Sequence, residues 1–169
     1  DLGYYGRLNV EGKIGQGFMF AGAGYGNFNN LERGAELGRQ PWTDYSQYSG
    51  DIKLNYLVAE NRMLTVSLQH FVQQDLTRSD RFPNRLTVFD PQQRSMAYLR
   101  YIGTEVTGPL FDRFSVTGSF QRQREASSDQ RLNTNNLDVG EFDTEQVGLL
   151  VLFSRELAWL GRLTYGVDI

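Results

Sequence analysis

The clearest pattern of hydrophobic and polar positions in the chain covers residues 48–72, YSGDIKLNYLVAENRMLTVSLQHFV. In its first half, Ile52 and Leu54 alternate with Asp51 and Lys53, and residues 64–72 repeat the alternation in the second half. A period of two residues is typical of a β-strand with one apolar and one polar face. The short segment at residues 59–62 predicts a tight turn, so the stretch is predicted to be a long antiparallel hairpin.

The same alternation recurs along the chain and predicts an all-β fold of about eight strands in four hairpins. The predicted strands are residues 4–11, 18–28, 48–56, 64–72, 97–107, 114–125, 143–155 and 162–169. Short turns alternate with three long loops, predicted at residues 31–47, 75–94 and 126–141. All four prolines are expected in connections, where they cost no ladder hydrogen bond. Residues 1–169 are therefore expected to form a single antiparallel β segment.

The length of the strands favours a membrane environment. Each arm of the first hairpin can run about 9–11 residues, as a tilted strand needs to cross a bilayer, whereas strands of soluble proteins average about 5–6 residues. The charged Asp51 and Lys53 in mid-strand would not fit a sandwich core. An antiparallel sheet with one solvated face explains the alternation equally well but not the length. The residues expected on one outward, lipid-facing side are Ile52, Leu54, Val66, Leu68, Val116, Val147, Leu149 and Val151.

The alternation of short turns and long loops is the layout of a transmembrane β-barrel, with short periplasmic turns and long extracellular loops. Aromatic residues near the short turns are expected to form a girdle at the periplasmic interface. These residues are Tyr56, Phe111, Phe114 and Trp159.

Composition excludes several classes of protein. No run of about 20 apolar residues occurs, which excludes a helical membrane protein but not a barrel, because half of a barrel's strand positions face water. Cysteine is absent, so disulfides, thiol catalysis and cysteine metal sites are excluded. The net charge is −3 and no basic run indicates a nucleic-acid surface.

The sequence offers no convergent set of catalytic groups, so we expect no enzyme, no cofactor and no metal site. The single histidine, His70, shares the outward parity of Leu68 and Val72, which favours an interfacial polar residue over a haem ligand. Acidic residues around the third loop are expected to be ordinary solvated carboxylates; they are Glu125, Asp129, Glu141 and Asp143. Glycines 22, 24 and 26 on one face predict a curved strand and not a phosphate loop, since no helix pattern follows them.

Several segments resemble barrel strands of the TonB-dependent outer-membrane receptors. The resemblance lies in FSVTGSFQRQRE at 114–125, FDTEQVGLLVLFSREL at 142–157 and LTYGVDI at 163–169, and extends to residues 24–34 and 48–70. It implies import of a scarce, bulky nutrient, such as a siderophore, haem, cobalamin or glycan, across the outer membrane of a Gram-negative-type bacterium. The implied partners are outer-membrane lipid, the small-molecule substrate, a plug domain and TonB.

The chain departs from that family in size, because family members have a plug and a barrel of about 22 strands. We therefore expect an internal segment of the β-barrel with the plug domain absent. A self-contained eight-stranded outer-membrane barrel with a structural or adhesive role, and a soluble ligand-binding β-barrel or sandwich, remain as alternatives. A self-contained barrel would pair residues 1–11 with residues 162–169.

The candidate functional residues are polar residues on the inward side of the predicted strands and residues of the first long loop. Arg7, Arg100 and Arg162 share the inward parity, where they either contact a plug or an anionic substrate or pair with neighbours such as Glu11, Asp51 and Asp168. In the first long loop, Arg39, Trp42 and Tyr45 are candidate substrate contacts, because Arg and aromatic side chains are favoured in recognition.

Overall fold

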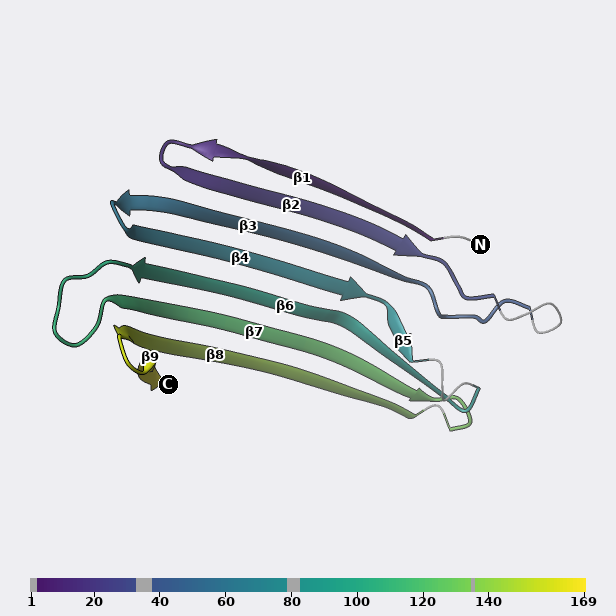
Figure 1. Cartoon of the computed structure of the whole chain (residues 1–169). Coiled ribbons are helices and arrows are strands. Elements are labelled where there is room, and N and C mark those ends of the chain that lie inside the picture. Colours follow the sequence, from purple (N-terminus) through teal and green to yellow (C-terminus); the bar gives the residue numbers. More distant parts are fainter. Residues whose placement is uncertain (1–2, 33–37, 79–82, 135) are drawn as a thin grey trace.

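The computed structural model describes residues 3–32, 38–78, 83–134 and 136–169. In these residues the chain is all-β and contains nine antiparallel strands and no helix (Figure 1). The strands are β1 (Tyr4–Ile14), β2 (Gly17–Phe28), β3 (Tyr45–Ala59), β4 (Arg62–Gln74), β5 (Leu76–Arg78), β6 (Arg85–Gly103), β7 (Arg113–Arg131), β8 (Asn136–Leu157) and β9 (Gly161–Asp168). The predicted fold class is therefore confirmed at the level of an antiparallel β-sheet.

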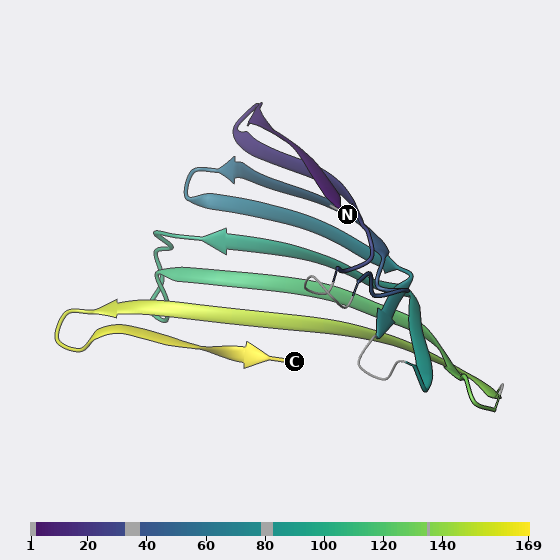
Figure 2. The ribbon, with the colours of Figure 1, turned by 90° about the vertical axis from the view of Figure 1, so that its right-hand side faces the viewer.

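The strands form one sheet in the order β1-β2-β3-β4-β6-β7-β8-β9, and the short β5 pairs with the first part of β6. Each long strand thus lies beside the strand that follows it, as in a simple meander. Tight turns make this possible, since Gly15 and Asn61 in two of the turns, and Gly161 at the start of β9, adopt positive φ angles. Figure 2 shows a single curved layer with the two termini at different edges.

The sheet is open. β1 forms one edge and β9 forms the other, and they do not pair with each other. The pairing of residues 1–11 with residues 162–169, which a self-contained barrel requires, is therefore not observed in the described residues.

Two of the three predicted long loops are wrong. Most of residues 75–94 belongs to β5 and β6, and most of residues 126–141 extends the ladder between β7 and β8, from Ala126↔Glu141 to Arg131↔Asn136. Both faces of these segments are rich in polar residues, so the alternation that reveals a half-buried strand is missing. Residues 33–37 of the predicted loop 31–47 and residues 79–82 of the second loop lie outside the described residues.

The predicted positions of the prolines are wrong for Pro91, which lies within β6. The register between β6 and β7 shifts between Phe89 and Gln92, so the ladder is already interrupted where the proline stands. Proline is tolerated in strands at such irregularities because its missing N–H leaves no bond unmade.

The register divides the side chains between two faces. We call the face with Ile52 and Leu68 the apolar face, and the face with Asp51 and Gln69 the polar face. The eight residues predicted to share one side all lie on the apolar face, so their common face is confirmed, and its contact with lipid stays a prediction. Val72 is the one buried hydrophobic side chain among the described residues, so this part of the chain has no core closed between two layers.

Candidate functional site

The polar face carries a network of cross-strand contacts that begins at Arg7 of β1. The Arg7 guanidinium spans β2 and forms an ion pair with Asp51 of β3, and its Nε donates to Asn9 Oδ1 at 2.8 Å. Gly22 of β2 makes this path possible, because a Cβ there would lie 2.7 Å from Asn9 Oδ1 and would also clash with the Arg7 guanidinium. Of the two alternatives left open for Arg7, pairing with a neighbouring carboxylate is the one observed, and the partner is Asp51.

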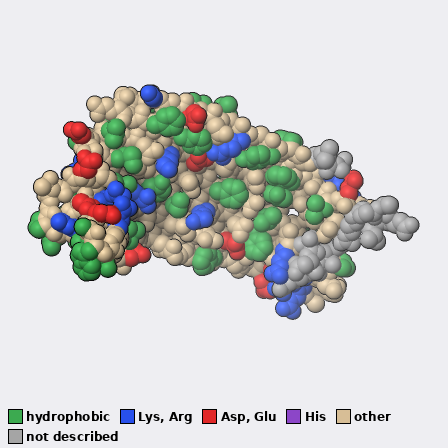
Figure 3. Space-filling model, viewed as in Figure 1, with side chains coloured by type: hydrophobic (Ala, Val, Ile, Leu, Met, Phe, Trp, Pro, Cys, Tyr) green, Lys and Arg blue, Asp and Glu red, His purple; other side chains and the backbone are tan. Residues whose placement is uncertain are grey.

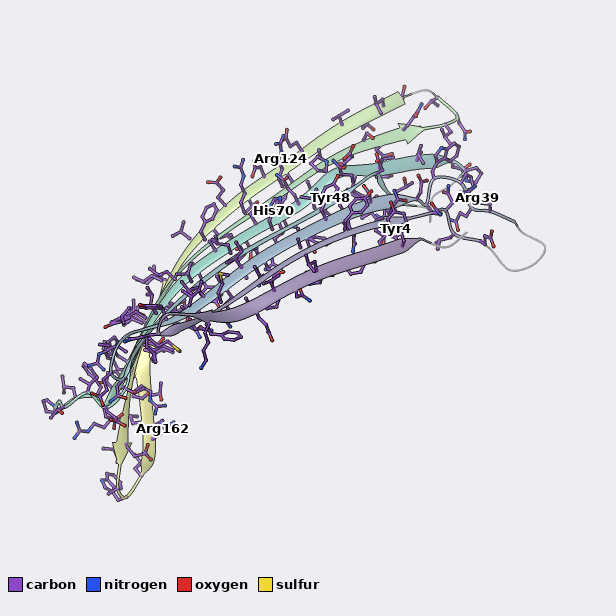
Figure 4. All side chains as sticks on the ribbon, turned by 90° about the horizontal axis from the view of Figure 1, so that it is seen from above. Tyr4, Arg39, Tyr48, His70, Arg124 and Arg162 are labelled. Atoms are coloured by element: carbon purple, nitrogen blue, oxygen red, sulfur yellow. The ribbon has the colours of Figure 1, made fainter. Side chains whose placement is uncertain are left out.

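The other two predicted inward arginines have different partners. Arg100 Nε donates to Thr117 Oγ1 at 3.1 Å, and its guanidinium lies 5.8 Å from the centre of the Tyr98 ring. Arg162 pairs with Glu156 at 3.1 Å and not with Asp168, in the β8–β9 hairpin. Figure 4 shows Arg162 at the opposite end of the sheet from Arg39. Of these three arginines, Arg7 and Arg162 form ion pairs with carboxylates among the described residues, and Arg100 does not.

Carboxylates predicted to be solvated loop residues are instead partners within the β6–β7–β8 ladder. Asp143 accepts from Arg122 Nη2 at 2.6 Å, Glu141 pairs with Arg124 at 2.7 Å, and Asp129 pairs with Arg85. The hydrogen bond from Arg122 lowers the pKa of Asp143, and the positive charge of Arg122 contributes to the same shift. The predicted loop placement is wrong, because these segments are strands, where side chains on neighbouring strands face each other at close range; the Glu141 side chain is nevertheless 54% exposed.

Arg122 and Arg124 mark one limit of the apolar face. Phe120 of β7 lies opposite Val147 of β8, and both side chains are apolar. The next pair on the same face, Arg122 opposite Glu145, is charged. Figure 3 shows a face of the sheet on which charged side chains lie over the middle strands as well as toward both ends, as expected for the polar face. On β7 and β8 the apolar band therefore ends at charged residues.

Aromatic side chains cluster at the end of the sheet that carries the turns at residues 15–16, 60–61 and 158–160, and also the connection at residues 104–112, which is longer than the short turn predicted there. Phe111 lies 4.8 Å from Phe153 and 6.1 Å from Phe114, measured between ring centres, and Phe153 lies 5.7 Å from Tyr165. Trp159, in the last turn, is 82% exposed. The predicted aromatic residues are therefore found at this end, which we call the short-turn end.

A second aromatic group, which the sequence analysis did not single out, lies toward the other end of the apolar face. Tyr25 stacks on Tyr48 with ring centres 5.9 Å apart, and Tyr4 lies 6.0 Å from Tyr25. The alternation of β2 and β3 places Tyr25 and Tyr48 on the same face as Ile52, but their contact depends on the register between the strands. The apolar face therefore has aromatic side chains toward both limits.

The three candidate substrate contacts do not form one site. Tyr45 begins β3 and stacks on Phe28 of β2 at 4.6 Å on the polar face. Arg39 and Trp42 lie in the connection before β3, where the backbone of Arg39 forms an isolated antiparallel β-bridge with that of Glu32, and Trp42 has a φ of 57°. Their role in substrate contact stays a prediction.

His70 lies on the apolar face, as predicted, and its Nδ1 is 2.8 Å from Ser95 Oγ on the neighbouring strand β6. The described residues contain no group of three or more His, Asp and Glu side chains able to hold a metal ion. No helix in the described part of the chain is long and apolar enough to cross a membrane.

Hollows occur on both faces of the sheet, and the apolar face has more than one. On the apolar face, a shallow groove of about 680 Å³ crosses β1 to β7, and small residues such as Ala21, Ala23 and Ala97 form part of its lining. On the polar face, a smaller hollow of about 380 Å³ lies over β3, β4 and β6. The surface that lines the groove on the apolar face is almost entirely apolar. The hollow on the polar face is lined in part by charged and amide side chains.

Comparisons of the chain with family models, curated proteins and solved structures found no match. The fold and the two faces therefore define a class of structure, an open antiparallel sheet with one apolar and one polar face, and carry the functional argument alone.

Proposed function

We propose that this chain forms part of the wall of a transmembrane β-barrel in an outer membrane, in a TonB-dependent receptor that imports a bulky nutrient. The apolar face contacts lipid and the polar face lines the lumen. The observation that carries the proposal is the shape of the apolar band. Its height is close to that of the apolar layer of a membrane, and the angle at which it crosses the strands is close to the tilt of strands in a barrel.

The height of the band follows from strand geometry. On β3, Tyr48 and Tyr56 lie toward its two limits, eight residues apart. At about 3.3 Å per residue this is about 26 Å along the strand, or about 21 Å along the membrane normal for a strand tilted by about 35°. The aromatic rings extend the band further, toward the apolar height of about 25 Å typical of outer-membrane barrels.

The slant of the band supports the tilt independently. The register leads from Tyr48 on β3 through Val72 and Gln93 to Arg124 and Asp143, so a row that is aromatic at β3 is charged at β8. On β8 the apolar band ends at Val147, which is four residues from Asp143, the residue aligned with Tyr48. The strand β8 is four strands away from β3 in the sheet, so the limit of the band shifts by four residues over four strands. A shift of about one residue per strand, with strands about 4.8 Å apart, corresponds to a tilt of about 35°.

The open edges of the sheet support a segment of a larger barrel over a complete small one. The outer side of β1 has no partner strand, and β9 pairs with β8 only from Leu150 to Leu157. Residues 136–148 of β8 therefore have a free edge in the described structure. Exposed edges of this length invite pairing with further strands, and closure of a barrel removes them.

The absence of native cysteine allows a direct test with single spin labels. We would label Leu99→Cys on the apolar face and Ser119→Cys on the polar face, in chain reconstituted into phospholipid vesicles. The label at residue 99 should be more accessible to oxygen than to a water-soluble nickel chelate, and the label at residue 119 should show the reverse. Equal access to the nickel chelate at both positions, or a monodisperse monomer without detergent, would contradict the membrane assignment.

The transport role is tested separately in the full receptor that contains this wall. Replacing residues 38–44 with a Gly/Ser linker removes Arg39 and Trp42 and leaves β3 intact. We expect weaker binding and uptake of the nutrient. A matched replacement of the short-turn residues 158–160 should leave binding unchanged, and equal binding by both variants would show that the first connection has no part in recognition.

A further inference from the structure

The hollow on the polar face is built from two neighbouring cross-strand rows. One row contains Ser49, Phe71 and Arg94, and the other contains Asp51, Gln69 and Met96. The side chains come from β3, β4 and β6, so rigid paired strands and not loops position them. The volume of about 380 Å³ is enough for a small organic molecule.

The charges around the hollow are not balanced. The negative charge of Asp51 is neutralised by Arg7. Arg94 Nη2 donates to a neutral acceptor, Gln121 Oε1, at 2.8 Å, and Arg94 forms no ion pair with any other described residue. The carboxylate of Glu125, further along β7, accepts from Gln92 Nε2 at 2.7 Å. A guanidinium with spare donors therefore lines the hollow.

The remaining lining suits a molecule with a flat apolar part. The Phe71 side chain is 37% exposed and lies opposite Arg94 in the register, and Met96 lies opposite Gln69. A planar guanidinium binds a carboxylate through two parallel hydrogen bonds, and an aromatic ring offers a face for stacking. Gln69 and Ser49 add donors at the side of the hollow nearer to β3.

We propose that this hollow binds a small organic anion, with its carboxylate on Arg94 and its apolar part against Phe71. Gln69 and Ser49 donate hydrogen bonds to its remaining oxygen atoms. The physiological role of the site, which is to bind an anionic solute on the lumen side of the barrel wall, rests on the proposed function. The binding chemistry itself depends only on the polar face of the sheet.

The test uses benzoate as the anion, with benzyl alcohol and benzylamine as the neutral and cationic analogues. Binding to the full chain in zwitterionic detergent is followed by saturation-transfer NMR. Arg94→Gln should weaken benzoate binding about tenfold or more, because a charge-assisted pair is lost, and Arg94→Lys should restore part of it. Arg100→Gln is the matched control, since Arg100 lies on the same strand and face, has a neutral partner and is outside the hollow. Its benzoate affinity should change less than about twofold.

Three results would overturn the site: equal losses in Arg94→Gln and Arg100→Gln, benzyl alcohol binding as tightly as benzoate, or no saturable benzoate binding. Phe71→Leu should weaken benzoate more than acetate, and equal effects on both would refute the aromatic contact. The spin label at residue 99 separates the two proposals. Lipid exposure without benzoate binding refutes the site alone, whereas benzoate binding without lipid exposure refutes the membrane proposal alone.

Discussion

Substituting Leu99 by arginine is the sharpest test of the medium that the apolar face contacts. Leu99 lies on β6, near the middle of the apolar band, between Val66 of β4 and Gly118 of β7, and is 52% exposed. Ser119 of β7 is an exposed residue at the same height on the polar face, opposite Tyr98. Ser119→Arg is therefore a control that adds the same side chain to the other face.

The expected magnitudes differ between water and lipid. In water, Leu99→Arg removes the contacts of a half-exposed leucine, which costs about 1 kcal/mol or less because the arginine stem keeps part of them. In lipid, an arginine near the midplane of the apolar band costs about 2–4 kcal/mol. At about 1.4 kcal/mol per factor of ten, a cost of about 3 kcal/mol lowers the folding equilibrium constant about a hundredfold.

The assay is equilibrium unfolding by urea in phospholipid vesicles, followed by the fluorescence of Trp42 and Trp159. We expect Leu99→Arg to lose about 2–4 kcal/mol and Ser119→Arg to change by less than about 1 kcal/mol. The membrane argument is refuted if the two variants agree within about 0.5 kcal/mol, since exposed positions of a sheet in water tolerate either substitution.

Two further predictions concern the fold. Gly17→Ala should destabilise the protein by about 1–3 kcal/mol, since its Cβ would lie 2.6 Å from the Asn55 carbonyl oxygen, whereas Gly118→Ala, with nothing within 4 Å, should stabilise it by about 0.5–1 kcal/mol; urea midpoints that move in the same direction would contradict this contrast. The second prediction concerns pH: Arg122 lowers the pKa of Asp143 below its ordinary value of 3.8, so the pair adds stability above pH 3.8 and loses it as the pH falls through the folded-state pKa. Asp143→Asn should therefore lower the urea midpoint at pH 7 and have no effect at pH 2, and an equal effect at both pH values would show that the carboxylate charge is not the cause.

The sequence by itself determined the strands in which one face is apolar and the other polar. Alternation places Ile52, Leu54, Val66 and Leu68 on one side whatever their neighbours are, because successive side chains of a strand point to opposite faces. It also placed His70 on the same face as Leu68. The pairing of Arg7 with Asp51 was among the alternatives, but the sequence could not choose it, since the contact crosses an intervening strand.

The tertiary structure alone decided the features that depend on register. The extension of β7 and β8 through residues 126–141 has no alternating pattern, and only the ladder between the two strands reveals it. The stacking of Tyr25 on Tyr48, and the hollow that joins Phe71 to Arg94, need strands distant in sequence to be aligned residue by residue. The periodicity of one strand fixes which face a side chain occupies. The hydrogen bonds between strands fix which side chains it meets there, and a shift of one residue would exchange the faces.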